Sequence, residues 1–409
     1  MPFSKLITLE NLNKIIKESN YKNPTAIQEK VIPLVLEKSD IMAKAQTGSG
    51  KTASFVLPIL ELFSKQNYEG KAKVKVLVLT PTRELALQIS QTFSLFSKYL
   101  NKKPKIVSVI GGESISTQLL EIQKGCDIVV ATTGRLVDIL DKKQLDLSKL
   151  EFLVLDEADK MLDLGFEQEL DTLLEMIPKT RQNLLFSATY PLKVKNIISK
   201  ITKNAIEISI DETPTVQKIE QRAITVNIEN RSPLLRELIS INDWEQILVF
   251  MANKRACDNI ASKFKKYGFN ASSFHADLTQ EERNKTIEDF KNKKIKILFA
   301  TDIAARGLHV DDISCVVNYD LPRATADYIH RIGRTGRAGK SGSAISFIGL
   351  EDFEHFALIE KRCNIKLEKE QIEGFELIGK PIKKEKGNAP VKGKRKSKKD
   401  KLREQSIKD

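Results

Sequence analysis

The chain has 409 residues, of which 41% are apolar, and this length favours about two packed domains with shorter extra segments. No run approaches the roughly eighteen apolar residues of a membrane helix and the first residues lack an apolar signal core, so we expect a soluble, cytoplasmic protein. Four cysteines without a C-x-x-C pair argue against a disulfide framework or a zinc site, and a net charge of +13 favours polyanionic partners.

The first segment that carries chemistry is Ala45-Gln46-Thr47-Gly48-Ser49-Gly50-Lys51-Thr52. A loop of small residues lets successive backbone N–H groups converge on the phosphates of a nucleotide, and the positive end of the following helix dipole favours the same charge. Lys51 adds a point charge and the Thr52 hydroxyl can ligate Mg²⁺. Ala45 replaces the glycine of the strict phosphate-loop pattern. The loop therefore predicts a phosphate site only in combination with a second motif.

Apolar runs that alternate with helical stretches follow this loop, at residues 76–79, 128–131, 152–155 and 184–186. This alternation predicts a parallel, doubly wound sheet. Asp156-Glu157-Ala158-Asp159 comes directly after the third run. At the carboxyl end of a buried strand, Asp156 can hold the Mg²⁺ shell, partly through water, and Glu157 can polarise the attacking water. Either motif alone is more typical of an ordinary turn or of a solvated helix start, but together they predict a nucleotide hydrolase.

A second α/β domain is predicted after a polar, proline-containing linker at residues 211–217. Its apolar runs lie at residues 247–250, 297–300, 315–318 and 344–347. The expected organisation is therefore a first domain over residues 1–210, a second domain over residues 218–375 and a tail over residues 376–409.

The second domain has no phosphate loop of its own, but it carries three arginines at three-residue spacing, Arg331, Arg334 and Arg337. Glycines separate them and allow an anion to approach closely. We interpret Arg334 and Arg337 as arginine fingers that complete a phosphate site held by the first domain. The alternative is a solvated helix face.

The tail is strongly basic: residues 380–409 contain thirteen Lys or Arg against four Asp or Glu, and the rest of the chain has a net charge of only +4. With few large apolar residues, the tail is expected to be disordered. It is either a solvated end without a function or a flexible arm for polyanions. Membrane binding is disfavoured, because no apolar face accompanies the charge.

Three motifs together resemble the DEAD-box ATP-dependent RNA helicases of superfamily 2, and the similarity runs from residue 3 to about residue 342. They are Asp156-Glu157-Ala158-Asp159, Ser187-Ala188-Thr189 and His330-Arg331-Ile332-Gly333-Arg334-Thr335-Gly336-Arg337. The short charged tail is similar to that of bacterial members. The resemblance implies an α/β fold of two tandem RecA-like domains with parallel sheets, which close on ATP and bend single-stranded RNA across both.

The resemblance also implies roles for residues that spacing alone would not single out. Phe3 would stack on adenine, and Gln28 would contact adenine N6 and N7 from a segment that includes Thr25. His309 stands where the family usually has the Asp that accepts a hydrogen bond from the ribose. Residues that couple the nucleotide to domain closure would be Asp159, Ser187, Thr189, His330 and Arg331. Residues that contact the RNA backbone would be Pro81, Thr82, Arg83, Gly112, Thr132, Arg135, Arg283 and Thr301.

The expected function is an ATP-dependent RNA helicase, with ATP and Mg²⁺, that separates short duplexes locally or remodels RNA–protein complexes such as ribosomal precursors or RNA decay assemblies. Contacts to the sugar-phosphate backbone imply little sequence specificity, and 2′-hydroxyl contacts would select RNA. One alternative is an ATP-gated RNA clamp or annealing chaperone with little unwinding. A translocating DNA helicase is the other, disfavoured by the Gln28 segment and by Asp-Glu-Ala-Asp.

Deletion of residues 380–409 is expected to leave the maximal rate of RNA-stimulated ATP turnover intact and to raise the RNA concentration needed for activation. The physical reason is the +9 charge excess of this segment. If the tail neutralises phosphates, its removal also flattens the dependence of log affinity on log salt concentration. Equal salt slopes for the full-length and truncated proteins would assign the tail to solubility alone.

Overall fold

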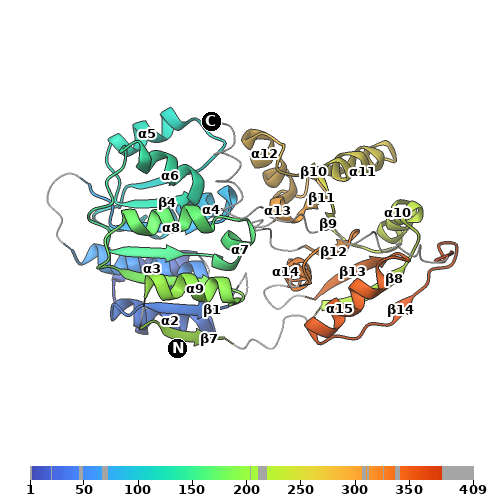
Figure 1. Cartoon of the computed structure of the whole chain (residues 1–409), viewed down its shortest axis with the longest axis horizontal. Coiled ribbons are helices and arrows are strands. Elements are labelled where there is room, and N and C mark those ends of the chain that lie inside the picture. Colours follow the sequence, from blue (N-terminus) through green and yellow to red (C-terminus); the bar gives the residue numbers. More distant parts are fainter. Residues whose placement is uncertain are drawn as a thin grey trace, which may run out of the picture.

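The computed structural model describes residues 2–19, 21–45, 49–66, 72–202, 204–210, 219–305, 310, 313–325, 327–336 and 341–379. The predicted linker at 211–217 and the basic tail from residue 380 lie outside the described residues, as do Gln46, Thr47, Gly48, His309 and Arg337. Two α/β domains lie side by side, the first coloured blue to green and the second yellow to red (Figure 1).

The first domain is built on a sheet of seven parallel strands in the order β3-β4-β2-β5-β6-β1-β7. These strands are β1 (Ile41–Lys44), β2 (Val76–Thr80), β3 (Ile106–Val109), β4 (Ile128–Thr132), β5 (Phe152–Leu155), β6 (Gln182–Ser187) and β7 (Ile206–Ser209). Since the central strands are apolar on both faces, helices must cover both sides of the sheet.

Alternate residues of one strand face the two helical layers of this domain. In β2, Val76 and Val78 pack with one layer, whereas Leu77 and Leu79 pack with the other. The first layer comprises α1 (Glu10–Glu18), α2 (Ala26–Leu36), α3 (Lys51–Ser64) and α4 (Arg83–Phe96). The second layer comprises α5 (Ile115–Gln123), α6 (Thr133–Asp141), α7 (Ala158–Asp163), α8 (Glu167–Met176) and α9 (Leu192–Ile201).

The second domain repeats this plan with strand order β10-β11-β9-β12-β13-β8-β14, again all parallel. Its strands are β8 (Ile219–Thr225), β9 (Ile247–Met251), β10 (Ala271–Phe274), β11 (Ile297–Thr301), β12 (Cys315–Asn318), β13 (Gly342–Ile348) and β14 (Lys369–Glu370). One face packs on α10 (Arg231–Ile241) and α11 (Lys254–Lys266). The other face packs on α12 (Gln280–Lys291), α13 (Asp302–Ala305), α14 (Asp327–Ile332) and α15 (Phe353–Cys363).

All eight predicted strand segments lie within observed strands, so the α/β fold of two parallel sheets is confirmed. The predicted runs omitted the shorter or more polar strands, β1, β3, β7, β8, β10 and β14. In β8 the polar stretch has a structural reason. Arg222 donates from Nε and Nη2 to the Glu370 carboxylate of β14 at 2.6–3.1 Å, so the charge is paired at the sheet edge instead of facing a core.

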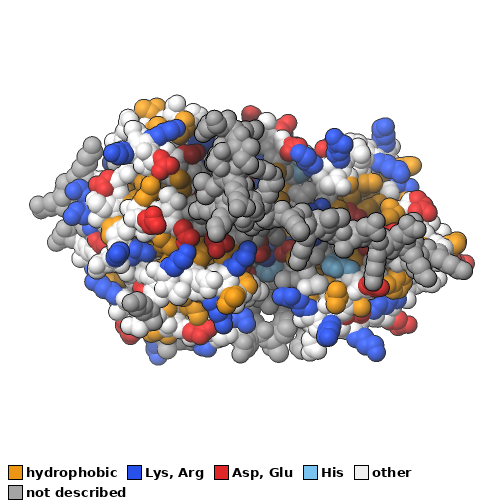
Figure 2. Space-filling model, in the orientation of Figure 1, with side chains coloured by type: hydrophobic (Ala, Val, Ile, Leu, Met, Phe, Trp, Pro, Cys, Tyr) orange, Lys and Arg blue, Asp and Glu red, His pale blue; other side chains and the backbone are white. Residues whose placement is uncertain are grey.

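The carboxyl ends of the strands in both sheets carry the segments that meet between the domains, where α7 and α14 face each other (Figure 1). On the face shown in Figure 2, basic and acidic side chains are interspersed over both domains, with no extended field of one sign. Among the helices of the described residues, none has both the length and the apolar character needed to cross a membrane.

Candidate functional site

The described part of the phosphate loop comprises Ala45, directly after β1, and residues 49–50, directly before α3. Gly50 has φ +94° and caps the amino end of α3, a left-handed conformation that glycine adopts without strain. Lys51 is the first residue of the helix and is buried, and its Nζ donates to the Ala45 carbonyl oxygen at 3.1 Å. The lysine amine therefore folds back over the start of the loop, where an anion bound by the loop would meet its charge.

Gln28 links this loop to the amino end of α2. Thr25 and Gln28 form a capping box, in which the Thr25 N–H donates to Gln28 Oε1 at 2.9 Å. Gln28 Nε2 also donates to the Gly50 carbonyl oxygen at 3.1 Å. One amide thus holds the predicted adenine-reading segment against the phosphate loop.

Phe3 lies in a short 3₁₀ helix (Phe3–Lys5) and is only 4% exposed. Its ring makes an edge contact with Tyr21, with centroids 6.2 Å apart, and Tyr21 makes a similar contact with Phe96 of α4. The structure therefore places Phe3 within the first core, and its stacking on adenine stays a prediction.

Asp156 and Glu157 follow β5, as the sequence predicts. Burial raises the pKa of Asp156 to about 6, although the nearby Lys51 charge acts in the opposite direction. The Glu157 N–H donates to Asp156 Oδ1 at 2.9 Å, and Glu157 itself has φ +53° at the start of α7. A left-handed conformation costs a non-glycine residue about 1–2 kcal/mol, and such strain gathers at functional sites.

These residues fit a magnesium ion. The Thr52 hydroxyl and the Asp156 carboxylate are hard oxygen donors, the kind that Mg²⁺ prefers. Burial raises the pKa of Asp156, and a bound cation would stabilise the ionised form of its carboxylate. No group of three or more His, Cys, Asp or Glu that could hold a metal occurs among the described residues. Mg²⁺ commonly binds through one or two carboxylates together with substrate phosphates, which Asp156 and a bound nucleotide would supply.

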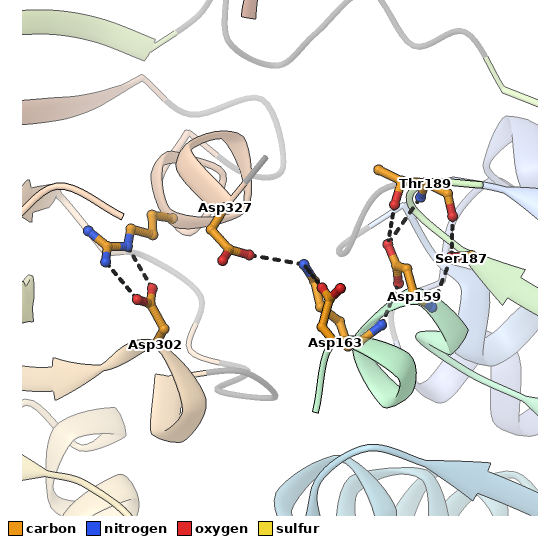
Figure 3. Close-up of polar contacts among 8 residues, drawn as sticks. Asp159, Asp163, Ser187, Thr189, Asp302 and Asp327 are labelled. Carbon is orange, nitrogen blue, oxygen red and sulfur yellow. Dashed lines mark hydrogen bonds and ion pairs between the residues drawn. The ribbon is translucent and has the colours of Figure 1, made fainter. Parts of the chain in front are cut away.

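The predicted coupling residues of the first domain form one hydrogen-bonded cluster (Figure 3). Asp159 Oδ2 accepts from the Thr189 N–H at 3.1 Å and from Thr189 Oγ1 at 2.9 Å. Ser187 Oγ accepts from the Asp159 N–H and donates to the Thr189 carbonyl oxygen. The end of β6 is thereby fixed to α7, so a displacement of α7 must carry residues 187–189 with it.

Across the interface, α14 presents His330 and leads to Arg334, which is buried. Burial, followed by the positive charge of Lys160, lowers the pKa of His330 to about 4, so the imidazole is neutral at neutral pH. Arg331 does not reach the first domain. It pairs with Asp302 through two hydrogen bonds of 2.6 and 2.7 Å, which anchor α14 to the segment after β11.

Three of the predicted RNA-contacting segments converge at the carboxyl ends of β2, β3 and β4. Thr82, which follows Pro81, caps α4 and accepts from the Leu85 N–H. The Arg83 guanidinium lies against Gly112, where a Cβ would be 1.9 Å from Arg83 Nη1. Thr132 Oγ1 accepts from the Gly111 N–H at 3.4 Å, and Arg135 donates from both terminal nitrogens to the Glu113 carbonyl oxygen at 3.2 Å.

Two predicted RNA contacts take part in joining the domains. Arg283 of α12 donates from Nε to Glu84 Oε1 at 2.7 Å, and both side chains are only 8% exposed. Arg83 Nη1 donates to Gln280 Oε1 at 3.4 Å. Thr301 ends β11 and is partly exposed. Sequence reasoning missed the interdomain role of Glu84, because motif spacing gives no information on contacts 199 residues apart.

It also missed Lys160 and Asp327, which form an ion pair of 3.0 Å between α7 and α14. Two weak features of the sequence could have indicated these residues. Lys160 directly follows the Asp-Glu-Ala-Asp motif, and Asp327 lies one helical turn before His330.

Comparison with known proteins places these features in a family. Residues 25–197 match the DEAD/DEAH box helicase family, and residues 230–339 match the helicase conserved C-terminal domain. The chain is 39% identical to the ATP-dependent RNA helicase DeaD of Mycobacterium tuberculosis over 88% of its own length and 63% of that protein. It thus spans less than two thirds of this relative.

Two solved structures are similar over nearly their whole length. Saccharomyces cerevisiae Dbp5 bound to RNA and ADP–BeF3 aligns with a TM-score of 0.81 at 32% identity, over 90% of this chain and 95% of that chain. A DEAD box protein from Methanococcus jannaschii is 39% identical over 88% of this chain and 97% of that chain, with a TM-score of 0.52.

Gly50→Ala is expected to lower the stability of the first domain by about 1–2 kcal/mol, because alanine is strained at φ +94°. It should also weaken nucleotide binding, because the new Cβ would lie 2.6 Å from Gln28 Nε2 and displace this amide. Thermal unfolding and binding of a fluorescent ATP analogue measure the two effects. Gly165→Ala is the matched control, since Gly165 has φ +87° and open space around it. The control should lose stability only, and equal loss of nucleotide affinity in both variants would contradict the loop geometry.

Proposed function

This chain belongs to the DEAD-box family of ATP-dependent RNA helicases, and from this premise we propose that it couples RNA-stimulated ATP hydrolysis to local unwinding of short RNA duplexes or to remodelling of RNA–protein complexes. The observation that carries the proposal is the apposition of two half-sites. The buried Lys51, Asp156 and Glu157 follow strands of the first domain, and α7, which begins after Glu157, is joined across the interface to α14, which leads to the buried Arg334.

The relative placement of the two domains is similar to that of a relative bound to RNA and ADP–BeF3, and this similarity supports the proposal. The archaeal structure is closer in sequence, at 39% identity, but it superposes less well, with a TM-score of 0.52 against 0.81 for Dbp5 with RNA and ADP–BeF3. Since both share the domain folds, the difference indicates a different domain placement. The chain therefore adopts an arrangement like that of the protein that holds RNA and nucleotide.

In the proposed mechanism the first domain binds ATP and the second completes the site. Lys51 and the loop N–H groups hold the phosphates, and Thr52 and Asp156 would hold Mg²⁺, which neutralises phosphate charge when bound. Glu157 accepts a proton from the attacking water. Closure brings Arg334 and Arg337 to the charge that grows in the transition state, so hydrolysis depends on closure. RNA and ATP both favour the closed form, and each therefore raises the affinity for the other.

RNA is the proposed partner, bound mainly through its sugar-phosphate backbone by segments at the carboxyl ends of β2, β3 and β4 and by the second domain. The proposal places the protein in the cytoplasm, where its four free thiols stay reduced. An ATP-gated RNA clamp or chaperone would use the same contacts. A combined assay of ATP turnover and displacement of a short RNA strand, with matched DNA as the control, separates these functions. Equal stimulation by RNA and DNA would overturn the assignment to RNA.

Glu157→Gln is expected to abolish ATP turnover and to preserve binding of ATP and RNA, because glutamine keeps the size of the side chain but cannot accept the proton. RNA should then dissociate slowly in the presence of ATP, since the closed state persists. Single-turnover hydrolysis and RNA dissociation rates measure both effects. Hydrolysis at the parent rate would show that another group is the base.

Arg334→Ala is expected to slow RNA-stimulated hydrolysis by about 10³-fold or more, the size reported for loss of an arginine finger in cis. ATP binding should weaken far less, because the charge that the guanidinium meets develops in the transition state. Arg236→Ala provides the control, since Arg236 stacks on Tyr267 at 3.9 Å within the second domain. Equal rates for the two variants would remove the finger assignment.

A further inference from the structure

We propose that Lys160 and Asp327 form the ion pair that holds the domains closed on the nucleotide side, which makes both of them positioning residues for ATP hydrolysis. Lys160 Nζ lies 3.0 Å from Asp327 Oδ1, and the two side chains are only 7% and 13% exposed. Asp327 points from α14 across the interface toward α7 (Figure 3). The pair therefore joins two helices from different domains in a site that excludes most water.

The two helices carry the reacting groups of the proposed mechanism. Glu157 caps the amino end of α7, three residues before Lys160. On α14, Asp327 precedes His330 by one turn, and Arg334 follows the helix end. An ion pair between these helices therefore fixes the distance between the general base and the arginine finger without contacting the nucleotide.

The neighbouring carboxylate Asp159 does not make this connection. Its Oδ1 accepts from the Lys160 backbone N–H at 3.0 Å, and its Oδ2 accepts from Thr189. Both oxygens are thus engaged within the first domain. The other interdomain contacts described above, Glu84–Arg283 and Arg83–Gln280, join α4 to α12 at the predicted RNA side. Lys160 and Asp327 are the described residues that connect α7 and α14 by an ion pair.

Loss of this ion pair would shift the equilibrium between the open and the closed arrangement of the two domains. When the domains separate, Asp327 regains water, and Lys160 keeps a second carboxylate, Asp163, at 3.6 Å in its own helix. In the closed form, removal of one partner takes away the ion pair that joins α7 to α14, and the remaining charge loses its partner from the other domain in an interface with little water. The loss therefore disfavours the closed state relative to the open state, and each domain keeps its fold.

The inference rests on the proposed function, and it is tested with near-isosteric neutral variants of the full chain, Lys160→Met and Asp327→Asn. Small-angle X-ray scattering with ADP–BeF3 and increasing single-stranded RNA reports closure without catalysis. We expect each variant to need about tenfold more RNA or more to become compact, the size expected when one partner of a desolvated charge pair is removed. ADP affinity without RNA should not change, because it depends on the first domain alone.

Two controls separate positioning from a general charge effect. Lys200→Met removes a Lys–Asp pair inside the first domain, Lys200–Asp171, whose side chains are 50% and 39% exposed, and it should behave like the parent. The double variant Lys160→Met/Asp327→Asn should need no more RNA for closure than either single variant, because the first change already removes the ion pair across the interface. Lys160→Arg should restore closure.

The possible outcomes are distinct. If the parent never becomes compact with RNA and ADP–BeF3, the proposed function fails, and this inference fails with it. If the parent becomes compact and Lys160→Met follows the same RNA dependence as Lys200→Met, only the positioning role is overturned. Additive losses in the double variant would also overturn the role, since they would mean that the two side chains act separately.

Discussion

The constraint on which this structure depends is the burial of both faces of each parallel sheet. Strands such as β5 and β9 are apolar at every position, because helices cover both sides. A charged group on such a face would lose its hydration without a partner. Polar chemistry is therefore confined to the edge where the strands end. Most residues with proposed roles lie in segments that follow the carboxyl ends of strands, and these edges of the two sheets face each other; Phe3, Thr25 and Gln28, which precede β1, are the exceptions.

This confinement creates the electrostatic properties of the site. Asp156 emerges from a fully buried strand into a region with little water, which raises its pKa to about 6. The same lack of water lowers the pKa of His330 to about 4. An anionic nucleotide with its cation is the complementary ligand for a lysine and a carboxylate held in this way. In the proposed function, the affinity of the site for a nucleotide would derive from the position of its residues at the ends of buried strands.

The sequence predicted what depends on local pattern and missed what depends on the fold. Apolar runs located eight strands, but the four-residue β10 (Ala-Ser-Ser-Phe) carries too weak a pattern to stand out. Motifs identified the residues with predicted roles, but not which of their atoms already form hydrogen bonds within the chain. Arg331 belongs to the predicted coupling motif, yet its guanidinium is paired with the Asp302 carboxylate. Phe3 is buried in the first core. Such partners lie far apart in the chain, so only the assembled sheets reveal them.

The described interdomain contacts are ionic or polar, and this composition suits the opening and closing that the proposed function requires. Glu84–Arg283, with both side chains 8% exposed, and Lys160–Asp327 lose hydration on closure and regain it on opening. Because desolvation offsets much of the Coulomb attraction, such pairs select one geometry without making closure irreversible. An apolar interface of the same extent would be stabilised by burial in the closed form and would expose a hydrophobic patch when open. In the proposed function, charge pairs would therefore leave RNA and nucleotide to decide which state is populated.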